Sequence, residues 1–145
     1  MSNTTKINIK NLKAFLRKNK KVDFRTADLL HLSNIDTYKW TGLEEHKESL
    51  IKQLKAYQRL LRIVPHDRED LAQDLLKSGF QSSLQIANTP RTVFIQDNLK
   101  TFGNDRTLVQ QVYRRALAVR KVVALQYVTR TQQTGSHVRV AGLAR

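Results

Sequence analysis

The feature that most constrains the fold is a helical repeat of apolar residues between Leu43 and Val64. Apolar side chains recur there at steps of three, four and seven residues, which places them on one face of an α-helix. Pro65 ends the helix, because proline disfavours the helical region in the residue before it. The buried stripe consists of Leu43, Leu50, Leu54, Tyr57, Leu61 and Val64, and the opposite face carries Lys52, Lys55, Arg59 and Arg62.

Shorter helices are predicted on both sides of this one. A basic amphipathic helix carries Leu12, Phe15 and Leu16 on its inner face, and a second early helix carries Phe24, Leu29, Leu30 and Leu32. After Pro65, a helix begins with Asp67 as its N-cap and ends at Gly79 in a left-handed conformation. A serine-capped helix follows from about Ser82 to Asn88. Thr89 and Pro90 open the next helix, with threonine as the N-cap and proline in the first helical position.

The longest helix is expected from Arg106 to about Thr131. Its buried face consists of Leu108, Val112, Ala116, Val119, Val123 and Tyr127. The residues after Gln133 have no helical period, and only Val138 to Leu143 resemble an edge strand. With 145 residues, 40% of them apolar, the chain can bury one core. We therefore expect an all-α, compact multi-helix bundle, with a single domain over residues 1–133 and a flexible basic tail over residues 134–145.

The segment that precedes the longest helix resembles a helix-hairpin-helix or SAM-like unit. The resemblance covers residues 75–87, Phe94, Leu99, Gly103 and Tyr113, and its hairpin is Phe102 to Arg106. In such units the backbone N–H groups of the hairpin can bind a DNA phosphate. Here Asp105 places a negative charge where the phosphate would lie, and a second glycine is missing. A turn that serves only packing is the simpler interpretation, and phosphate binding is the alternative.

The net charge of +14 is concentrated at the two ends of the chain. From Lys6 to Arg25 there are eight basic residues and one acid, so this N-terminal arm carries +7. From Arg106 to Arg145 there are eight basic residues and no acid, which gives +8. The part between them is nearly neutral. Such ends are suited to an acidic partner.

Six basic residues are the candidate electrostatic binding residues. They are Lys10, Lys13 and Arg17 on the first helix, and Arg114, Arg115 and Lys121 on the last. This density of charge can neutralise phosphates and support sequence-independent binding of nucleic acid. A solvated basic face has the same pattern, and no aromatic residues alternate with these cations as a base-stacking surface requires.

Catalytic and cofactor-binding patterns are not found in the sequence. The chain has no cysteine, its four histidines lie on separate predicted elements, and its five glycines form no phosphate-binding loop. Acidic clusters at Glu44–Glu45 and at Asp67, Glu69 and Asp70 lie in first helical turns, where the helix dipole explains them. We therefore expect a protein that is not an enzyme and has no cofactor, no metal and no membrane span. The first residues lack the pattern of a Sec signal peptide, so we expect cytoplasmic synthesis, with release or delivery by another route left open.

From about Ile9 to Val128 the order of features resembles the N-terminal helical region of bacterial insecticidal toxin-complex A subunits and related neuraminidase-like toxin proteins. The matching motifs are residues 11–16, 23–25, 35–36, 54–62, 79–87 and 90–95. In that family these helices belong to the outer shell of a protein-translocating toxin. The resemblance implies a role in scaffolding and in contacts between subunits, although 145 residues leave no room for a channel or for receptor-binding domains.

Two functions follow as hypotheses. The first is a non-enzymatic structural or protein-interaction module of a bacterial toxin-complex-like system, whose basic ends dock on an acidic protein surface or toxin subunit. The alternative is a small nucleic-acid-binding module that acts through phosphate contacts.

Overall fold

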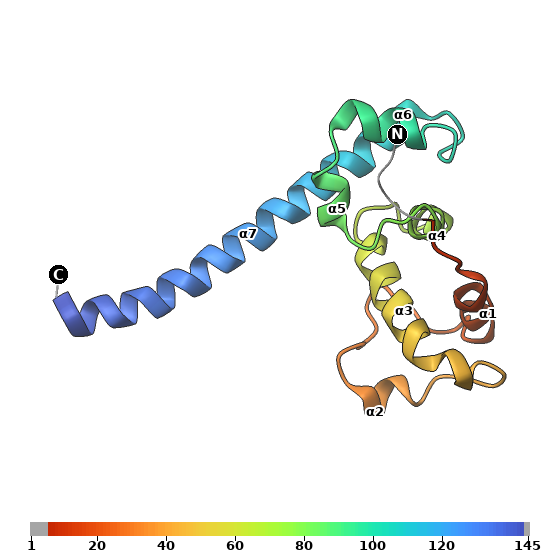
Figure 1. Cartoon of the computed structure of the whole chain (residues 1–145), viewed down its shortest axis with the longest axis horizontal. Coiled ribbons are helices and arrows are strands. Elements are labelled where there is room, and N and C mark those ends of the chain that lie inside the picture. Colours follow the sequence, from red (N-terminus) through yellow and green to blue (C-terminus); the bar gives the residue numbers. More distant parts are fainter. Residues whose placement is uncertain (1–5, 144–145) are drawn as a thin grey trace.

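The computed structural model describes the backbone of residues 6–143 and the side chains of residues 6–131. Every regular element among the described residues is a helix (Figure 1). In chain order these are α1 (Lys10–Lys18), α2 (Leu32–Ile35), the short 3₁₀ helix η1 (Glu44–His46), α3 (Lys47–Leu61), α4 (Glu69–Lys77), α5 (Ser83–Ala87), α6 (Arg91–Asn98) and α7 (Arg106–Leu143). This arrangement confirms the predicted all-α class and the long C-terminal helix.

The helices pack in two groups around one hydrophobic core. In the first group α3 lies against α4 and α1, and in the second α7 lies against α5 and α6. The ring of Phe15 anchors the first group, with centroid distances of 5.7 Å to Phe24 and 4.6 Å to Trp40. The ring of Phe94 anchors the second, at 5.6 Å from both Phe80 and Tyr113.

The apolar stripe of α3 is buried as its spacing predicts. All six side chains of the stripe are at most 6% exposed, and Leu54 is fully buried. The helix ends at Leu61, somewhat before Pro65, and the guanidinium group of Arg25 lies at its C-terminus. There it donates hydrogen bonds to the carbonyl oxygens of Leu61, Val64 and Pro65. The Leu61 carbonyl has no partner within the helix, so Arg25 serves the fold although it belongs to the basic arm.

The end of α4 confirms the left-handed glycine. Gly79 has a φ of +106°. The N–H of Gly79 donates to the Leu76 oxygen at 2.9 Å, and the N–H of Phe80 donates to the Leu75 oxygen at 3.0 Å. This pair of bonds is the Schellman motif, and it turns the chain toward α5.

The helix caps agree with the sequence in one case and differ in two. Ser82 caps α5 as expected, accepting a hydrogen bond from the Gln85 N–H. The N-cap of α4 is Arg68, so the prediction of Asp67 is wrong by one residue. The N-cap of α6 is Pro90. Thr89, predicted for that position, instead donates its hydroxyl to the Gln85 oxygen at the end of α5, at 2.8 Å.

The prediction of a second early helix around Phe24 to Leu32 is wrong, since the short helix α2 begins only at Leu32. Residues 20–31 form turns, and Leu30 and Leu32 are 86% and 60% exposed. The backbone N–H groups of Arg25 and Leu30 donate to the carboxylates of Asp23 and Asp28, two residues earlier in each case. Such Asx turns compete with the helix for backbone hydrogen bonds.

The helix α7 leaves the rest of the molecule and extends into solvent (Figure 1). Val112 and Ala116 are buried as predicted, but Val123 and Tyr127 are 50% and 71% exposed, so their predicted burial is wrong. The stripe continues along the helix, but every side chain from Arg120 to Thr131 is exposed, because the covering helices end before this part of α7.

The backbone of α7 is helical to Leu143, beyond the predicted end near Thr131 and through the segment that resembled an edge strand. No proline interrupts this segment, and each of its two glycines, Gly135 and Gly142, costs a helix only about 1 kcal/mol. The side chains of the predicted tail, residues 134–145, and the backbone of residues 144–145 lie outside the described part of the structure, so its flexibility stays a prediction.

Candidate interaction surface

The three basic residues selected on α1 lie on its outer face. Lys10, Lys13 and Arg17 are all exposed, while Leu12 and Phe15 on the inner face are fully buried. The spacing of the helix therefore separates charge from core, as the sequence predicts. These cations can meet a partner without any rearrangement of the fold.

The basic residues selected on α7 are less uniform. Arg114 and Lys121 are exposed, and Arg115 is half-buried. The neighbouring Arg120 donates to the Ala87 oxygen at 3.2 Å and to Asn88 Oδ1 at 3.3 Å. Arg120 therefore attaches α7 to the end of α5.

The structure does not bring the two selected groups together. α1 packs against α3, whereas α7 packs against α5 and α6, and Figure 1 shows α1 and α7 on different sides of the molecule. The basic ends are two surfaces and not one.

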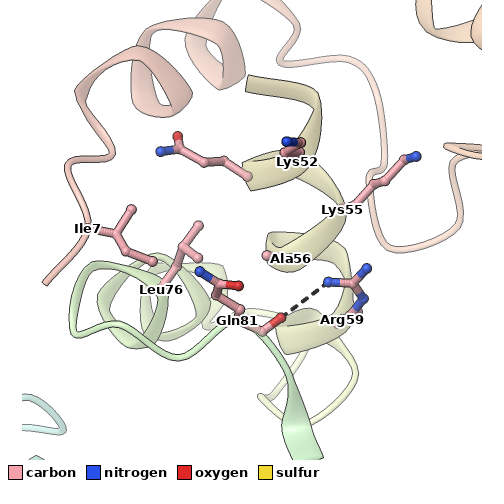
Figure 2. Close-up of a pocket in the computed structure, with 8 residues that line it drawn as sticks. Ile7, Lys52, Lys55, Ala56, Arg59, Leu76 and Gln81 are labelled. Atoms are coloured by element: carbon pink, nitrogen blue, oxygen red, sulfur yellow. Dashed lines mark hydrogen bonds between the residues drawn. The ribbon is translucent and has the colours of Figure 1, made fainter. Parts of the chain in front are cut away.

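A third basic surface lies between them, on the outer face of α3. Lys52, Lys55 and Arg59 border a hollow of about 370 Å³ whose floor includes Ile7 and Leu76 (Figure 2). The guanidinium group of Arg59 donates to the backbone oxygen of Gln81 at 3.4 Å, which joins α3 to the segment before α5. The regular spacing of these cations was visible in the sequence, but only the fold places them around a hollow.

A second hollow of about 390 Å³ lies on the other side of Lys55 and Arg59. Its basic edge continues to Arg62. Its apolar lining comes from three separate parts of the chain: Leu29 and Leu30 before α2, Leu84 in α5, and Val119 and Val123 in α7. Sequence reasoning missed this site, because no local pattern shows that these segments meet.

From this hollow onward, α7 exposes large apolar side chains on more than one side of the helix. Between Val122 and Val128, the side chains that are large, apolar and exposed are Val122 (53%), Val123 (50%), Leu125 (58%), Tyr127 (71%) and Val128 (46%). Several such side chains within two helical turns mark an interaction site more often than isolated exposed leucines do.

The hairpin before α7 is a packing turn, and its own Asp105 carboxylate supplies a negative charge at the start of the helix. Gly103 and Asn104 have φ values of +66° and +62°, and the Asp105 carboxylate accepts a hydrogen bond from the Leu108 N–H at 3.1 Å. The carboxylate therefore occupies the end of α7 where a phosphate would bind. This geometry favours the packing interpretation over phosphate binding.

Two acidic side chains and one histidine are engaged in local contacts. Asp70 pairs with Arg68 at 3.2 Å, and His31 bonds Asp28 at 2.6 Å, a contact that lowers the pKa of Asp28. Burial, assisted by Glu69, raises the pKa of Tyr57 to about 12. Within the part of the chain that the structure describes, no three His, Cys, Asp or Glu side chains converge in a way that could hold a metal ion.

No described helix has both the length and the hydropathy to cross a lipid bilayer. Comparison with known protein families, curated proteins and solved structures finds no match to this chain.

Proposed function

We propose that this chain is a non-enzymatic helical protein-interaction module in which α7 and the basic surfaces dock on an acidic protein. The observation that carries the proposal is the exposed apolar segment of α7 from Val122 to Val128. A helix that projects from its own core and exposes large apolar side chains is suited to pair with a helix or groove of another protein.

The positive charge of α7 indicates the sign of the charge on the partner's surface. The sequence from Arg106 onward contains eight basic residues and no acid. Opposite charges around an apolar contact accelerate association and exclude wrong partners, while like charges oppose it. An acidic surface is therefore the best complement.

The finer proposal is that the partner is a subunit of a toxin-complex-like assembly. Its support is the resemblance of residues 9–128 to the helical region of toxin-complex A subunits. A role in contacts between subunits agrees with a projecting, apolar and basic helix.

Site-specific photo-cross-linking in cells tests the proposal. A photoreactive residue replaces Leu125 on α7, and the matched control carries it at Thr41, which is exposed in a loop away from α7. We expect the Leu125 probe to yield discrete adducts with an acidic protein that resist nuclease, and the Thr41 probe to yield none. Adducts that disappear on nuclease treatment, or equal labelling from both positions, would contradict it.

A second candidate function is non-specific binding of nucleic acid. The observation in its favour is that Lys10, Lys13 and Arg17 are exposed on one face of α1. Together with Arg114, Arg115 and Lys121 they could contact phosphates, as cationic surfaces commonly do.

A further inference from the structure

The hollow between α3, α5 and α7 has the composition of a helix-binding groove. Its floor is aliphatic, with Leu29 buried at its base. Leu30, Leu84 and Val123 around it are 86%, 49% and 50% exposed. Apolar side chains that project into an open hollow lose water contact only when an occupant covers them, so binding here is favoured by the hydrophobic effect.

The edge of the groove fixes the charge of the occupant. Lys55, Arg59 and Arg62 follow one side of the hollow at steps of four and three residues, and its lining residues include no aspartate or glutamate. Of these three, Arg59 donates a hydrogen bond to the Gln81 backbone oxygen, and that bond is long at 3.4 Å. A row of cations beside an aliphatic floor complements a segment with acids on one side and apolar residues on the other.

The neighbouring elements favour a helix as the occupant. The groove is formed by helices, and the described residues contain no strand edge that an extended peptide could join. Val119 and Val123 are one helical turn apart on α7, so they match anchors at the i, i+3, i+4 and i+7 positions of a second helix lying along it.

We propose that this groove binds an acidic amphipathic helix of another protein, with its apolar face on Leu84 and Val123 and its acids along Lys55, Arg59 and Arg62. This inference rests on the proposed function and specifies its partner. A second copy of the chain is a poorer occupant, since its long helix is basic and would place cations against cations. Nucleic acid is also a poorer occupant, because no aromatic side chain lines the groove for base stacking.

A binding titration with the full chain tests the inference. The probe is a fluorescein-labelled peptide of about 18 residues, long enough for several helical turns, with leucines at i, i+3, i+4 and i+7 and glutamates beside them. A second peptide has lysine at every glutamate position. We expect micromolar binding of the acidic peptide by fluorescence anisotropy, and binding of the basic peptide weaker by about a hundredfold, since several charge contacts change sign.

Exposed residues allow substitutions that leave the fold intact. Leu84→Ser and Val123→Ser remove parts of the floor, and Leu32→Ser is the matched control because Leu32 is 60% exposed and lies outside the groove. Arg62→Glu reverses one charge at the edge, and Lys100→Glu is its control. We expect each groove variant to lower the affinity for the acidic peptide by about tenfold or more, and both control variants to leave that affinity unchanged.

Besides failure of the acidic peptide to bind, three results would overturn the inference. The first is equal binding of the two peptides, or equal effects of groove and control variants. The second is displacement of the peptide by duplex DNA with the same sensitivity to Leu84→Ser. The third is a dimer of the chain alone, found by sedimentation, that Val123→Ser dissociates. Failure of the peptide to bind while Leu125 still cross-links to an acidic protein would reject the groove and leave the proposed function standing, whereas loss of those cross-links would reject the proposed function itself.

Discussion

The Asp105 carboxylate accepts a hydrogen bond from the Leu108 N–H at 3.1 Å and thereby caps the first turn of α7. The bond satisfies one of the N–H groups that a helix leaves without an internal partner. It also supplies the negative charge that a helix N-terminus attracts. The same interaction stabilises the fold and removes the most obvious phosphate site from the molecule.

Replacement of this cap should destabilise the protein. Asp105→Ala should lower the free energy of unfolding by about 1 kcal/mol, the usual cost of losing an N-cap side chain. Asp105→Asn should keep most of the stabilisation, because asparagine also caps helices well. Asp97→Ala is the control, because Asp97 is exposed on α6 and caps no helix. Urea denaturation measures the three values. A cost equal to that of the control would mean that the cap contributes nothing.

A side chain at position 79 should destabilise the protein. At a φ of +106°, Gly79→Ala introduces strain that glycine avoids, so we expect a loss of about 1 kcal/mol in the free energy of unfolding. Lys77→Ala, at an exposed helical position two residues earlier, should be close to neutral. If Gly79→Ala were neutral or stabilising in thermal denaturation, the Schellman turn between α4 and α5 would be wrong.

The buried stripe of α3 should dominate stability. Leu54 is fully buried, so Leu54→Ala should cost about 2 to 5 kcal/mol through lost burial and the cavity left behind. Lys52→Ala, on the exposed face of the same helix, should cost less than about 0.5 kcal/mol. Chemical denaturation of both variants checks the orientation of α3. Similar losses in the free energy of unfolding for the two variants would contradict this orientation.

Asp74 on α4 should oppose folding at neutral pH. Desolvation, assisted by Asp70, raises its pKa, while Lys13 and Lys77 act in the opposite direction. A raised folded-state pKa in a carboxyl group means that its penalty is present above that pKa and vanishes once the group is protonated in both states. Asp74→Asn should therefore raise the free energy of unfolding at pH 7, and the gain should fade as the pH falls through the raised folded-state pKa and vanish below the ordinary pKa of 3.8. A gain that grows toward acid pH would contradict this sign.

Much of the fold could be predicted because local sequence determines it. The apolar period of α3, the glycine after α4, the serine before α5 and the turn at Gly103 each act within a few residues. The segment from Asn19 to Trp40 could not be predicted, since distant partners hold it. Asn19 bonds the backbone of Lys39 through both its amide nitrogen, at 3.1 Å, and its oxygen, at 2.9 Å. The amide of Gln58 donates to the Phe24 oxygen at 2.8 Å.

The candidate site was only half visible in the sequence. The basic positions on α1, α3 and α7 follow from helical spacing, whereas the apolar groove requires Leu30, Leu84 and Val123 to meet across the fold. The exposure of Val123 and Tyr127 was missed for a related reason. Periodicity identifies an apolar face of α7, but it does not show where the helices that cover this face end.

The basic surfaces should serve a protein partner and not nucleic acid, and a titration of labelled duplex DNA tests this most directly. Fluorescence anisotropy is measured at about 50 and about 200 mM salt, the range over which six or more phosphate contacts lose about a thousandfold in affinity. We predict weak binding, with a dissociation constant above about 10 μM at the higher salt, as for non-specific contacts. Sub-micromolar binding with a steep salt slope, flattened when Lys10, Lys13 and Arg17 are replaced by alanine together, would contradict the account and establish nucleic-acid binding in its place.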